Sequence, residues 1–179
     1  GGNFDEPVTQ ATLKVVGAFH GLSRARSDAR RYPAIDPLDS WTKYNSVVDN
    51  TSVEKARSLL RRGTEVGQMM KVVGEEGTSL DDFLLYLKSE YIDATYLQQD
   101  AYDAIDGATD AARQQHVFAV MARILDTPMR FENKEAARHF FHQLVQTTKD
   151  WNRIERSAPA FRTTQEKIEK SVAEVAVHA

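Results

Sequence analysis

The sequence predicts a mainly α-helical protein, a bundle of about five or six helices preceded by a small α/β segment. From residue 51 onward, apolar residues recur at the three- and four-residue spacing of amphipathic helices. The interruptions between these runs carry glycine and proline, which end helices. Among the 179 residues, 41% are hydrophobic and 27% are charged, which is typical of globular domains.

The first 50 residues predict short, mixed elements. The stretch "TLKVVGAF" (12–19) is rich in β-forming residues and reads either as a strand or as the start of a helix. The stretch "SRARSDARR" (23–31) predicts a short helix with Ser23 at its N-cap. This helix must stop near Arg31, because the position before Pro33 is pushed out of the α region. Pro33 and Pro37 then predict an extended turn.

Residues 53–91 predict a helical hairpin. Thr51 and Glu54 have the spacing of a capping box at its start. The first helix has a weak middle at Gly63 and Gly67, and "GEEGTS" (74–79) is the turn. Ser79 can cap the second helix. The end of the hairpin is acidic, with Glu75, Glu76, Asp81 and Asp82.

The rest of the chain alternates irregular and helical stretches. "YLQQDAYDAIDG" (96–107) breaks the periodicity, and a helix over about 109–126 follows and ends before Pro128. Asn133 opens the next helix, which carries one apolar stripe. After the break at Pro159, residues 163–177 predict a last, charged helix.

Composition excludes several classes of protein. The chain has no cysteine, which excludes disulfides and thiolate metal sites. The net charge of -3 provides no global field for nucleic acid, so no nucleic-acid partner is expected. No apolar run reaches the roughly 20 residues of a membrane span, and the first residues do not resemble a signal peptide. The chain lacks an initiator methionine, from which we expect it to begin within a longer protein.

The familiar catalytic motifs are missing from this sequence. It contains neither a G-x-x-x-x-G-K-[ST] phosphate loop nor a G-x-S-x-G or H-E-x-x-H motif, so we expect no catalytic residue in the chain. Glu135, His139 and His142 share one helix face at a spacing that metal ligands could use. No second ligand-bearing helix is evident, and the interpretation favoured is surface histidines without a metal.

Three other sets of residues have both an ordinary structural interpretation and a functional one. Arg24, Arg26, Arg30 and Arg31 form either a solvated helix face or a contact for phosphate or another subunit. The acidic end of the hairpin is either a soluble turn or a lever that touches a partner. Tyr32 and Tyr102 lie in irregular segments, where each ring either covers a core edge or forms a stacking platform for a planar ligand.

Three segments, in the same order along the chain, carry a family resemblance. "GGNFDEPVTQATLKVVGAF" closely resembles the G-G-D-F-S-E-P-V-T-Q-x-T-L-R segment of the catalytic A subunit of V-type (archaeal/vacuolar-type) rotary ATP synthases. "RRYPAID" is similar to R-R-H-F-P-A-I-N, and "YLQQDAYDAID" is similar to F-L-Q-Q-N-A-F-D-x-x-D of that family. The resemblance covers residues 1 to about 126.

The resemblance implies a domain organisation. Residues 1–48 would be the C-terminal end of an incomplete nucleotide-binding α/β domain, and residues 49–179 would be the C-terminal helical domain. The phosphate loop and the catalytic glutamate would lie upstream. The resemblance also implies that Tyr32 and Tyr102 sandwich the adenine ring, although the family has phenylalanine at both positions.

In this family the hairpin pushes on the central stalk, which would make Glu75, Glu76, Asp81 and Asp82 rotor contacts. The intact enzyme would use ATP or ADP with Mg, and would hydrolyse or make ATP coupled to proton or sodium transport. Its partners would be the family's B subunit and the D subunit of the central stalk, in the cytoplasm and peripheral to the membrane, without direct membrane insertion. This chain alone is expected to bind no cofactor and to do no chemistry. The alternative is a free-standing helical adaptor that binds a protein partner through its acidic hairpin.

Overall fold

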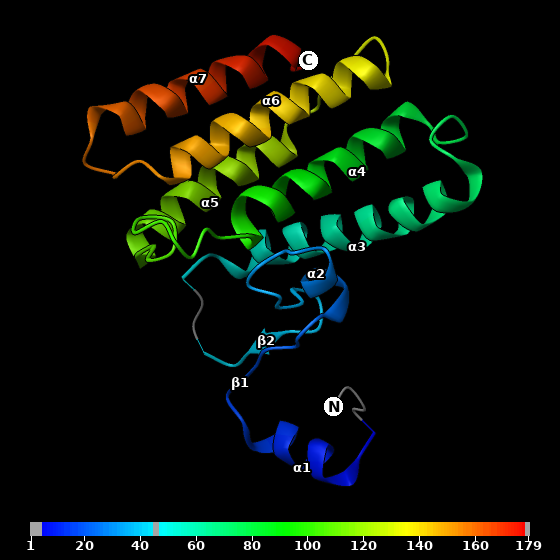
Figure 1. Ribbon diagram of the computed structural model, residues 1–179, viewed down its shortest axis with the longest axis vertical. Coiled ribbons are helices and arrows are strands. Elements are labelled where there is room, and N and C mark those ends of the chain that lie inside the picture. Colours follow the sequence, from blue (N-terminus) through cyan, green and yellow to red (C-terminus); the bar gives the residue numbers. More distant parts are fainter. Residues whose placement is uncertain (1–4, 45–46, 178–179) are drawn as a thin grey trace. The chain divides into compact units, whose positions relative to one another are not determined.

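The structure is a computed structural model that describes residues 5–44 and 47–177 (Figure 1). The chain divides into two compact units, an N-terminal unit, Gly1–Ser46, and a helical unit, Val47–Ala179. The proposal that the first unit belongs to a nucleotide-binding domain stays a prediction.

The N-terminal unit contains two short helices and a two-stranded antiparallel sheet. The elements are α1 (Pro7–Val15), β1 (Ala18–Phe19), α2 (Arg24–Asp28) and β2 (Trp41–Thr42). In the sheet, Phe19 pairs with Trp41, and their rings lie 6.3 Å apart. Residues 12–19 therefore contain the end of α1 followed by β1. A strand was one of the two expectations, whereas the other, a helix that starts here, was wrong because α1 begins at Pro7.

The segment around the two prolines is held by hydrogen bonds rather than by regular structure. The Ser23 amide donates to the Ala34 carbonyl at 2.8 Å, and the Asp36 amide donates to the Gly21 carbonyl at 2.7 Å. The Asp36 carboxylate accepts from the Leu38 amide at 2.8 Å. These bonds confirm an ordered turn, because they satisfy backbone groups that no helix or sheet pairs.

Over residues 47–177, the helical unit is a bundle of five α-helices and one short π-helix. Along the chain these are α3 (Asn50–Val73), α4 (Leu80–Ile92), η1 (Asp93–Leu97), α5 (Ala111–Asp126), α6 (Lys134–Asn152) and α7 (Pro159–Val175). Helices α3, α4, α6 and α7 contact each other in that order (Figure 1). The mainly helical class is confirmed. None of the helices in the described ranges is long and apolar enough to cross a membrane.

The core of the helical unit lies between α4, α5, α6 and α7. Tyr91, Met121 and Trp151 are almost completely buried there, and the Trp151 ring stacks on Phe161 at 4.8 Å. The Tyr91 hydroxyl lies 3.1 Å from the Thr148 hydroxyl, so the polar end of this buried ring has a partner. The apolar stripes identified in the sequence therefore face one another.

Three predicted helix ends were wrong. Asp49, not the Thr51–Glu54 capping box, caps α3, and its carboxylate accepts from the Ser52 amide at 2.8 Å. Helix α2 ends at Asp28 instead of near Arg31. Helix α7 begins at Pro159, four residues before the predicted start, because proline suits the first turn of a helix. The caps predicted at Ser23, Ser79 and Asn133 are confirmed.

The weak middle of α3 packs directly against α4. A Cβ at Gly63 would collide with the side chain of Ser89, and a Cβ at Gly67 would lie 3.3 Å from the Tyr86 ring. The two glycines therefore do not break the helix. They remove side chains at the interface and let the two helices of the hairpin approach each other.

Two long, positively charged side chains donate hydrogen bonds to carbonyl groups at the ends of neighbouring helices. The Lys88 ammonium, on α4, donates to the carbonyls of Leu125 and Thr127, both at 2.7 Å. The Arg113 guanidinium, on α5, donates to the carbonyls of Ile154 at 2.7 Å and of Asn152. The last carbonyls of a helix have no partner inside it, so these bonds connect the bundle at its ends.

Candidate functional site

The loop between η1 and α5, residues 98–110, is built by aspartate side chains. The Asp106 carboxylate accepts from the Asp100 amide at 2.7 Å. The Asp103 carboxylate accepts from the amides of Ile105 and Asp106, both at 2.9 Å, and the Asp100 carboxylate accepts from the Tyr102 amide at 3.1 Å. Each carboxylate thus replaces a backbone partner, which explains why the "QDAYDAID" stretch has order without a helical period.

We call residues 98–110 the tyrosine loop, because it presents Tyr102 outward. The Tyr102 side chain is fully exposed, with a relative accessibility of 102%. An exposed aromatic ring on a loop fixed by its own carboxylates contributes nothing to the core. The interpretation that Tyr102 covers a core edge is therefore wrong for this structure, whereas its role as a stacking platform stays a prediction.

The carboxylates of the tyrosine loop have different electrostatic environments. Hydrogen bonds from the amides of Asp106 and Ile105 lower the pKa of Asp103. Burial raises the pKa of Asp106, and the nearby charge of Asp103 raises it further. An ion pair of 3.0 Å joins Asp100 to Arg153, just beyond the end of α6. The loop is therefore held by an ion pair to the helical bundle as well as by hydrogen bonds within itself.

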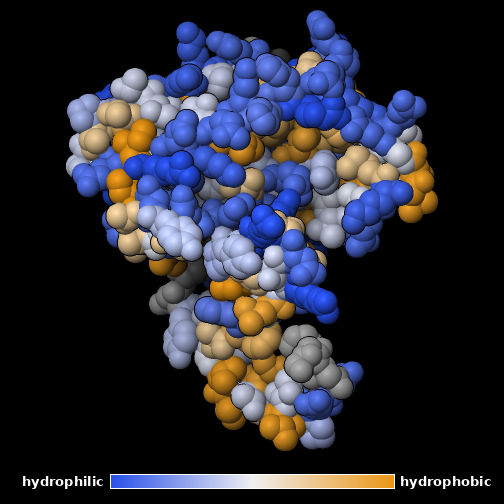
Figure 2. Space-filling view, in the orientation of Figure 1, coloured by the Kyte–Doolittle hydropathy of each residue, from blue (hydrophilic) through white to orange (hydrophobic). Residues whose placement is uncertain are grey.

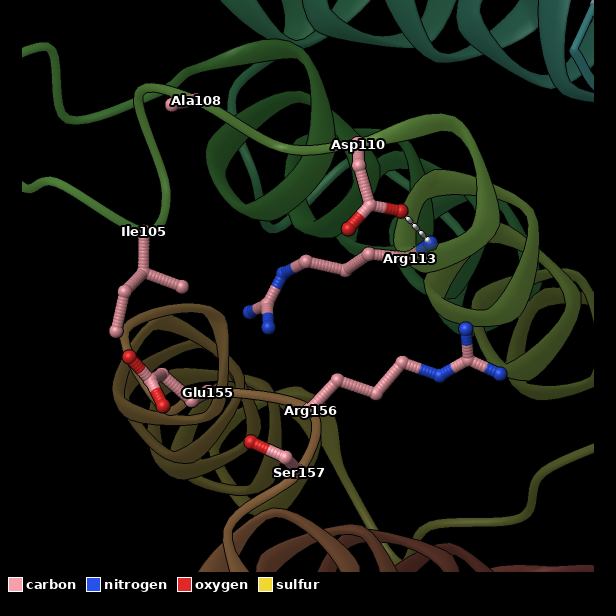
Figure 3. Close-up of a pocket in the computed structure, with 7 residues that line it drawn as sticks. All are labelled: Ile105, Ala108, Asp110, Arg113, Glu155, Arg156 and Ser157. Atoms are coloured by element: carbon pink, nitrogen blue, oxygen red, sulfur yellow. Dashed lines mark hydrogen bonds between the residues drawn. The ribbon is translucent and has the colours of Figure 1, made fainter.

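A cavity of about 580 Å³ lies beside the tyrosine loop (Figure 3). The residues that line it are Ile105, Ala108, Asp110, Arg113, Glu155, Arg156 and Ser157. In Figure 3, the guanidinium groups of Arg113 and Arg156 point in opposite directions. Arg113 binds the carbonyls at the end of α6, and Asp110 caps α5 by accepting from the Arg113 amide at 2.8 Å. Two of the charged residues that line this cavity, Arg113 and Asp110, therefore already stabilise the fold.

Tyr32, the second predicted aromatic, belongs to the N-terminal unit and is 53% exposed. It follows α2 and precedes the turn that Asp36 stabilises. Tyr32 and Tyr102 thus lie in separate units, and each ring is accessible in its own unit. Their shared role at one adenine ring stays a prediction.

The end of the hairpin, residues 69–82, is called the hairpin tip. Two of its four carboxylates have partners within the chain. Glu75 forms an ion pair with Arg138 of α6, and its carbonyl accepts from the Lys134 ammonium. Asp82 accepts from the Ser79 hydroxyl at 2.8 Å at the start of α4. Glu76 and Asp81 are exposed.

The other residue groups singled out in the sequence lie at the surface or form ordinary contacts. His139 bonds to Gln143 at 2.9 Å on the exposed face of α6, and Glu135 pairs with Arg138. Within residues 5–44 and 47–177, no group of three or more histidine or carboxylate residues could hold a metal ion. In the arginine cluster, Arg24 forms an exposed ion pair of 3.7 Å with Asp28. A contact of this cluster with phosphate or another subunit stays a prediction.

Comparisons with known proteins give one consistent family. The profile of the C-terminal domain of V and A type ATP synthase matches residues 50–132. The V-type ATP synthase alpha chain of Treponema denticola is 56% identical over 176 residues, which is 98% of this chain and 30% of the relative. The V-type ATP synthase alpha chain of Borreliella burgdorferi is 59% identical over 152 residues, which is 85% of this chain and 26% of the relative. The chain thus spans less than a third of the length of these curated relatives.

A solved structure shows the same type of fold. An ATP synthase subunit, NeqB from Nanoarcheaum equitans, superposes with a TM-score of 0.58 over 72% of this chain and 33% of that chain. The sequences are 17% identical, so this likeness concerns the fold alone. The family match and the alpha-chain relatives do not favour the alternative of a free-standing helical adaptor.

Proposed function

This chain belongs to the V-type ATP synthase alpha-chain family, as the C-terminal part of such a chain, and from that premise we propose that it works inside an ATP-driven rotary enzyme. In the intact complex, the alpha chain would hydrolyse or make ATP, coupled to proton or sodium transport. This part would contribute an adenine contact and a contact with the rotor. The sequence of this part contains no phosphate loop, so the chemical step would be carried by other parts of the alpha chain.

The exposed Tyr102 ring is the observation that carries the adenine proposal. A ring held outward by a preformed loop loses little conformational freedom when a planar ligand stacks on it. Stacking of a base on an aromatic side chain contributes about 1–3 kcal/mol in nucleic-acid platforms. Tyr32, from the N-terminal unit, would contact the same adenine ring. Such stacking would orient ATP or ADP, whose phosphates and Mg would be held upstream.

The alpha chain would bind the B subunit of the enzyme and the D subunit of its central stalk. The enzyme would sit in the cytoplasm, peripheral to the membrane. The hairpin tip supports the stalk contact because it is exposed at one end of the helical unit and carries Glu76 and Asp81 outward.

The test compares nucleotide affinity among three versions of the intact complex. Tyr102→Ala should weaken ATP binding about 5- to 150-fold, which corresponds to a loss of about 1–3 kcal/mol. Tyr102→Phe is the matched control and should keep the wild-type affinity, because the ring carries the interaction. The kcat at saturating ATP should stay nearly unchanged, because stacking on the base stabilises the bound substrate and the transition state equally. Equal affinity of wild type and Tyr102→Ala would exclude the adenine role.

A further inference from the structure

The backbone of Tyr102 is connected to the end of α6 by two consecutive polar contacts. Arg153 donates from its Nη2 atom to the Oδ2 atom of Asp100 at 3.0 Å, and the Oδ1 atom of the same carboxylate accepts from the Tyr102 amide at 3.1 Å. Arg153 lies just beyond α6, at the same end of the helical unit as the tyrosine loop (Figure 1). One carboxylate therefore links a side chain of the bundle to the backbone that carries the exposed ring.

The backbone around Arg153 is fixed from within the bundle. Its amide donates to the Asp150 carbonyl at 3.2 Å at the end of α6. The Arg113 guanidinium, which is buried, donates to the carbonyls of Asn152 and Ile154, the residues on either side of Arg153. The Arg153 side chain therefore extends toward the tyrosine loop from a rigid base.

A second contact from the end of α6 holds the segment that leads into the tyrosine loop. The Asn152 side-chain amide donates to the Thr95 carbonyl at 2.6 Å, within η1. Both residues are buried. The last carbonyls of a helix lack partners inside it, and Asn152 supplies a donor for one of them. Residues 152 and 153 thus restrain the tyrosine loop at two points, before it begins and next to Tyr102.

The ion pair between Arg153 and Asp100 contributes little to the stability of the fold. The two side chains are 52% and 36% exposed, and the face of the helical unit drawn in Figure 2 is mostly hydrophilic. Ion pairs in contact with water are weak, because solvent screens the charges. A loop that is restrained before a ligand arrives nevertheless loses less conformational entropy on binding. The contact therefore affects a ligand of the loop more than it affects folding.

We propose that Arg153 is a positioning residue for base stacking, because through the Asp100 carboxylate it holds Tyr102 in the orientation that a planar base meets. This inference rests on the proposed function, and it adds to the same site a residue that does not itself touch the ligand. The ion pair restrains only the loop that carries the ring. Arg153 should therefore influence the binding of the base and leave the binding of the phosphates unchanged.

The test compares ATP with a ligand that has no base. In the intact complex, Arg153→Gln should weaken ATP binding about 2- to 5-fold, the size expected for one exposed ion pair. The affinity for inorganic tripolyphosphate with Mg, measured by competition with labelled ATP, should stay unchanged. Arg162→Gln is the matched control and should change neither affinity, since it removes an arginine from an exposed ion pair of 3.0 Å on α7. Equal losses for ATP and tripolyphosphate, or no loss for ATP, would overturn the proposal.

A double-mutant cycle tests whether Arg153 acts through Asp100. Asp100→Asn removes the charge and leaves an oxygen that can accept from the Tyr102 amide. Arg153→Gln combined with Asp100→Asn should weaken ATP binding no more than the larger of the two single losses, because both substitutions break the same ion pair. Losses that multiply would show that Arg153 acts by another route, and the proposal would be wrong.

Amide hydrogen exchange of the intact complex reports on the loop without any nucleotide. Arg153→Gln should speed the exchange of residues 98–106 by about 2- to 5-fold, whereas Arg162→Gln should not. Unchanged exchange in Arg153→Gln would exclude the positioning role. If Tyr102→Ala weakens ATP binding but Arg153→Gln does not, the positioning role fails and the adenine contact stands. If Tyr102→Ala leaves ATP affinity unchanged, the adenine contact fails, and the inference about base stacking fails with it.

Discussion

The Arg113 guanidinium donates to the carbonyl oxygen of Ile154 at 2.7 Å, which joins the first turn of α5 to the chain just beyond α6. The same guanidinium donates to the carbonyl of Asn152 and lies 5.2 Å from the centre of the Phe161 ring. Only 4% of this residue is exposed. A buried cation with this number of partners is a structural element of the bundle, and its removal leaves buried carbonyls without a donor.

Replacement of Arg113 should therefore destabilise the helical unit strongly. We expect Arg113→Met to lower the free energy of unfolding by about 2–4 kcal/mol, because the unsatisfied carbonyls add to the lost bonds. Arg153→Gln is a matched control, since it removes an arginine from an exposed ion pair with Asp100. Its cost should be below about 1 kcal/mol. Urea unfolding of both variants gives the comparison, and equal costs would contradict the structural role of Arg113.

Alanine at Gly63 should destabilise the hairpin, although alanine favours helices. The gain in helix propensity is about 1 kcal/mol, whereas overpacking against Ser89 costs about 1–3 kcal/mol. Gly67→Ala should be milder, because the nearest atom there belongs to the Tyr86 ring, 3.3 Å away. In thermal unfolding, the melting temperature of Gly67→Ala should be higher than that of Gly63→Ala. The reverse order would show that α4 does not approach α3 at Gly63.

Ionisation of the buried Tyr91 hydroxyl should make the folded protein less stable at high pH. Burial raises the pKa of Tyr91 to about 12 from an ordinary value of 10.0. A folded-state pKa above the unfolded value adds stability that is complete below pH 10 and is lost as the pH rises toward 12. The loss attributable to Tyr91 between pH 8 and pH 11 should be about 1.4 kcal/mol, or tenfold in the unfolding equilibrium.

The matched variant for this pH dependence is Tyr91→Phe. It removes the titrating hydroxyl together with its contact with Thr148, so the stability of the variant contains no contribution from ionisation at residue 91 at any pH. The Lys88 ammonium, whose pKa burial lowers, is present in both proteins and cancels in the difference. Urea unfolding at pH 8 and pH 11 should therefore show a smaller alkaline loss in Tyr91→Phe. Parallel losses would exclude Tyr91 as the source.

Tyr102→Ala should leave the stability of this chain almost unchanged. The ring is fully exposed, and surface substitutions away from special features usually change the free energy of unfolding by less than about 0.5 kcal/mol. A calorimetric scan of wild type and variant is sufficient. A decrease of several degrees in the melting temperature would mean that the ring packs against the bundle, and the stacking proposal would then lose its main support.

Amide hydrogen exchange should distinguish α1 from α5. Helix α1 has no buried side chain, so its hydrogen bonds can open locally at little cost. Helix α5 buries Val117, Val120, Met121 and Ile124, and its amides should exchange only through larger opening. We expect fast exchange over residues 9–15 and slow exchange over 117–124. Similar protection in both helices would show that α1 has partners outside its own unit.

The sequence alone determined the helical class and most of the helix ends. Caps at Ser23, Ser79 and Asn133 could be predicted because capping depends on one side chain and the few amides that follow it. The family could be recognised from three short segments, because their residue types are specific in combination. The cap at Asp49 was missed because Thr51 and Glu54 satisfy the same local rule two residues later.

Only the tertiary structure decided which side chains are paired or buried within the chain and which stay exposed at its surface. Glu75 and Glu76 are neighbours of the same type, yet only Glu75 is held by Arg138, which lies 63 positions further along the chain. Tyr91 and Tyr102 are both tyrosines close in sequence to the C-terminal end of α4, but one is buried and the other is fully exposed. Burial and pairing depend on contacts between distant segments, and a local pattern contains no information about which segments meet.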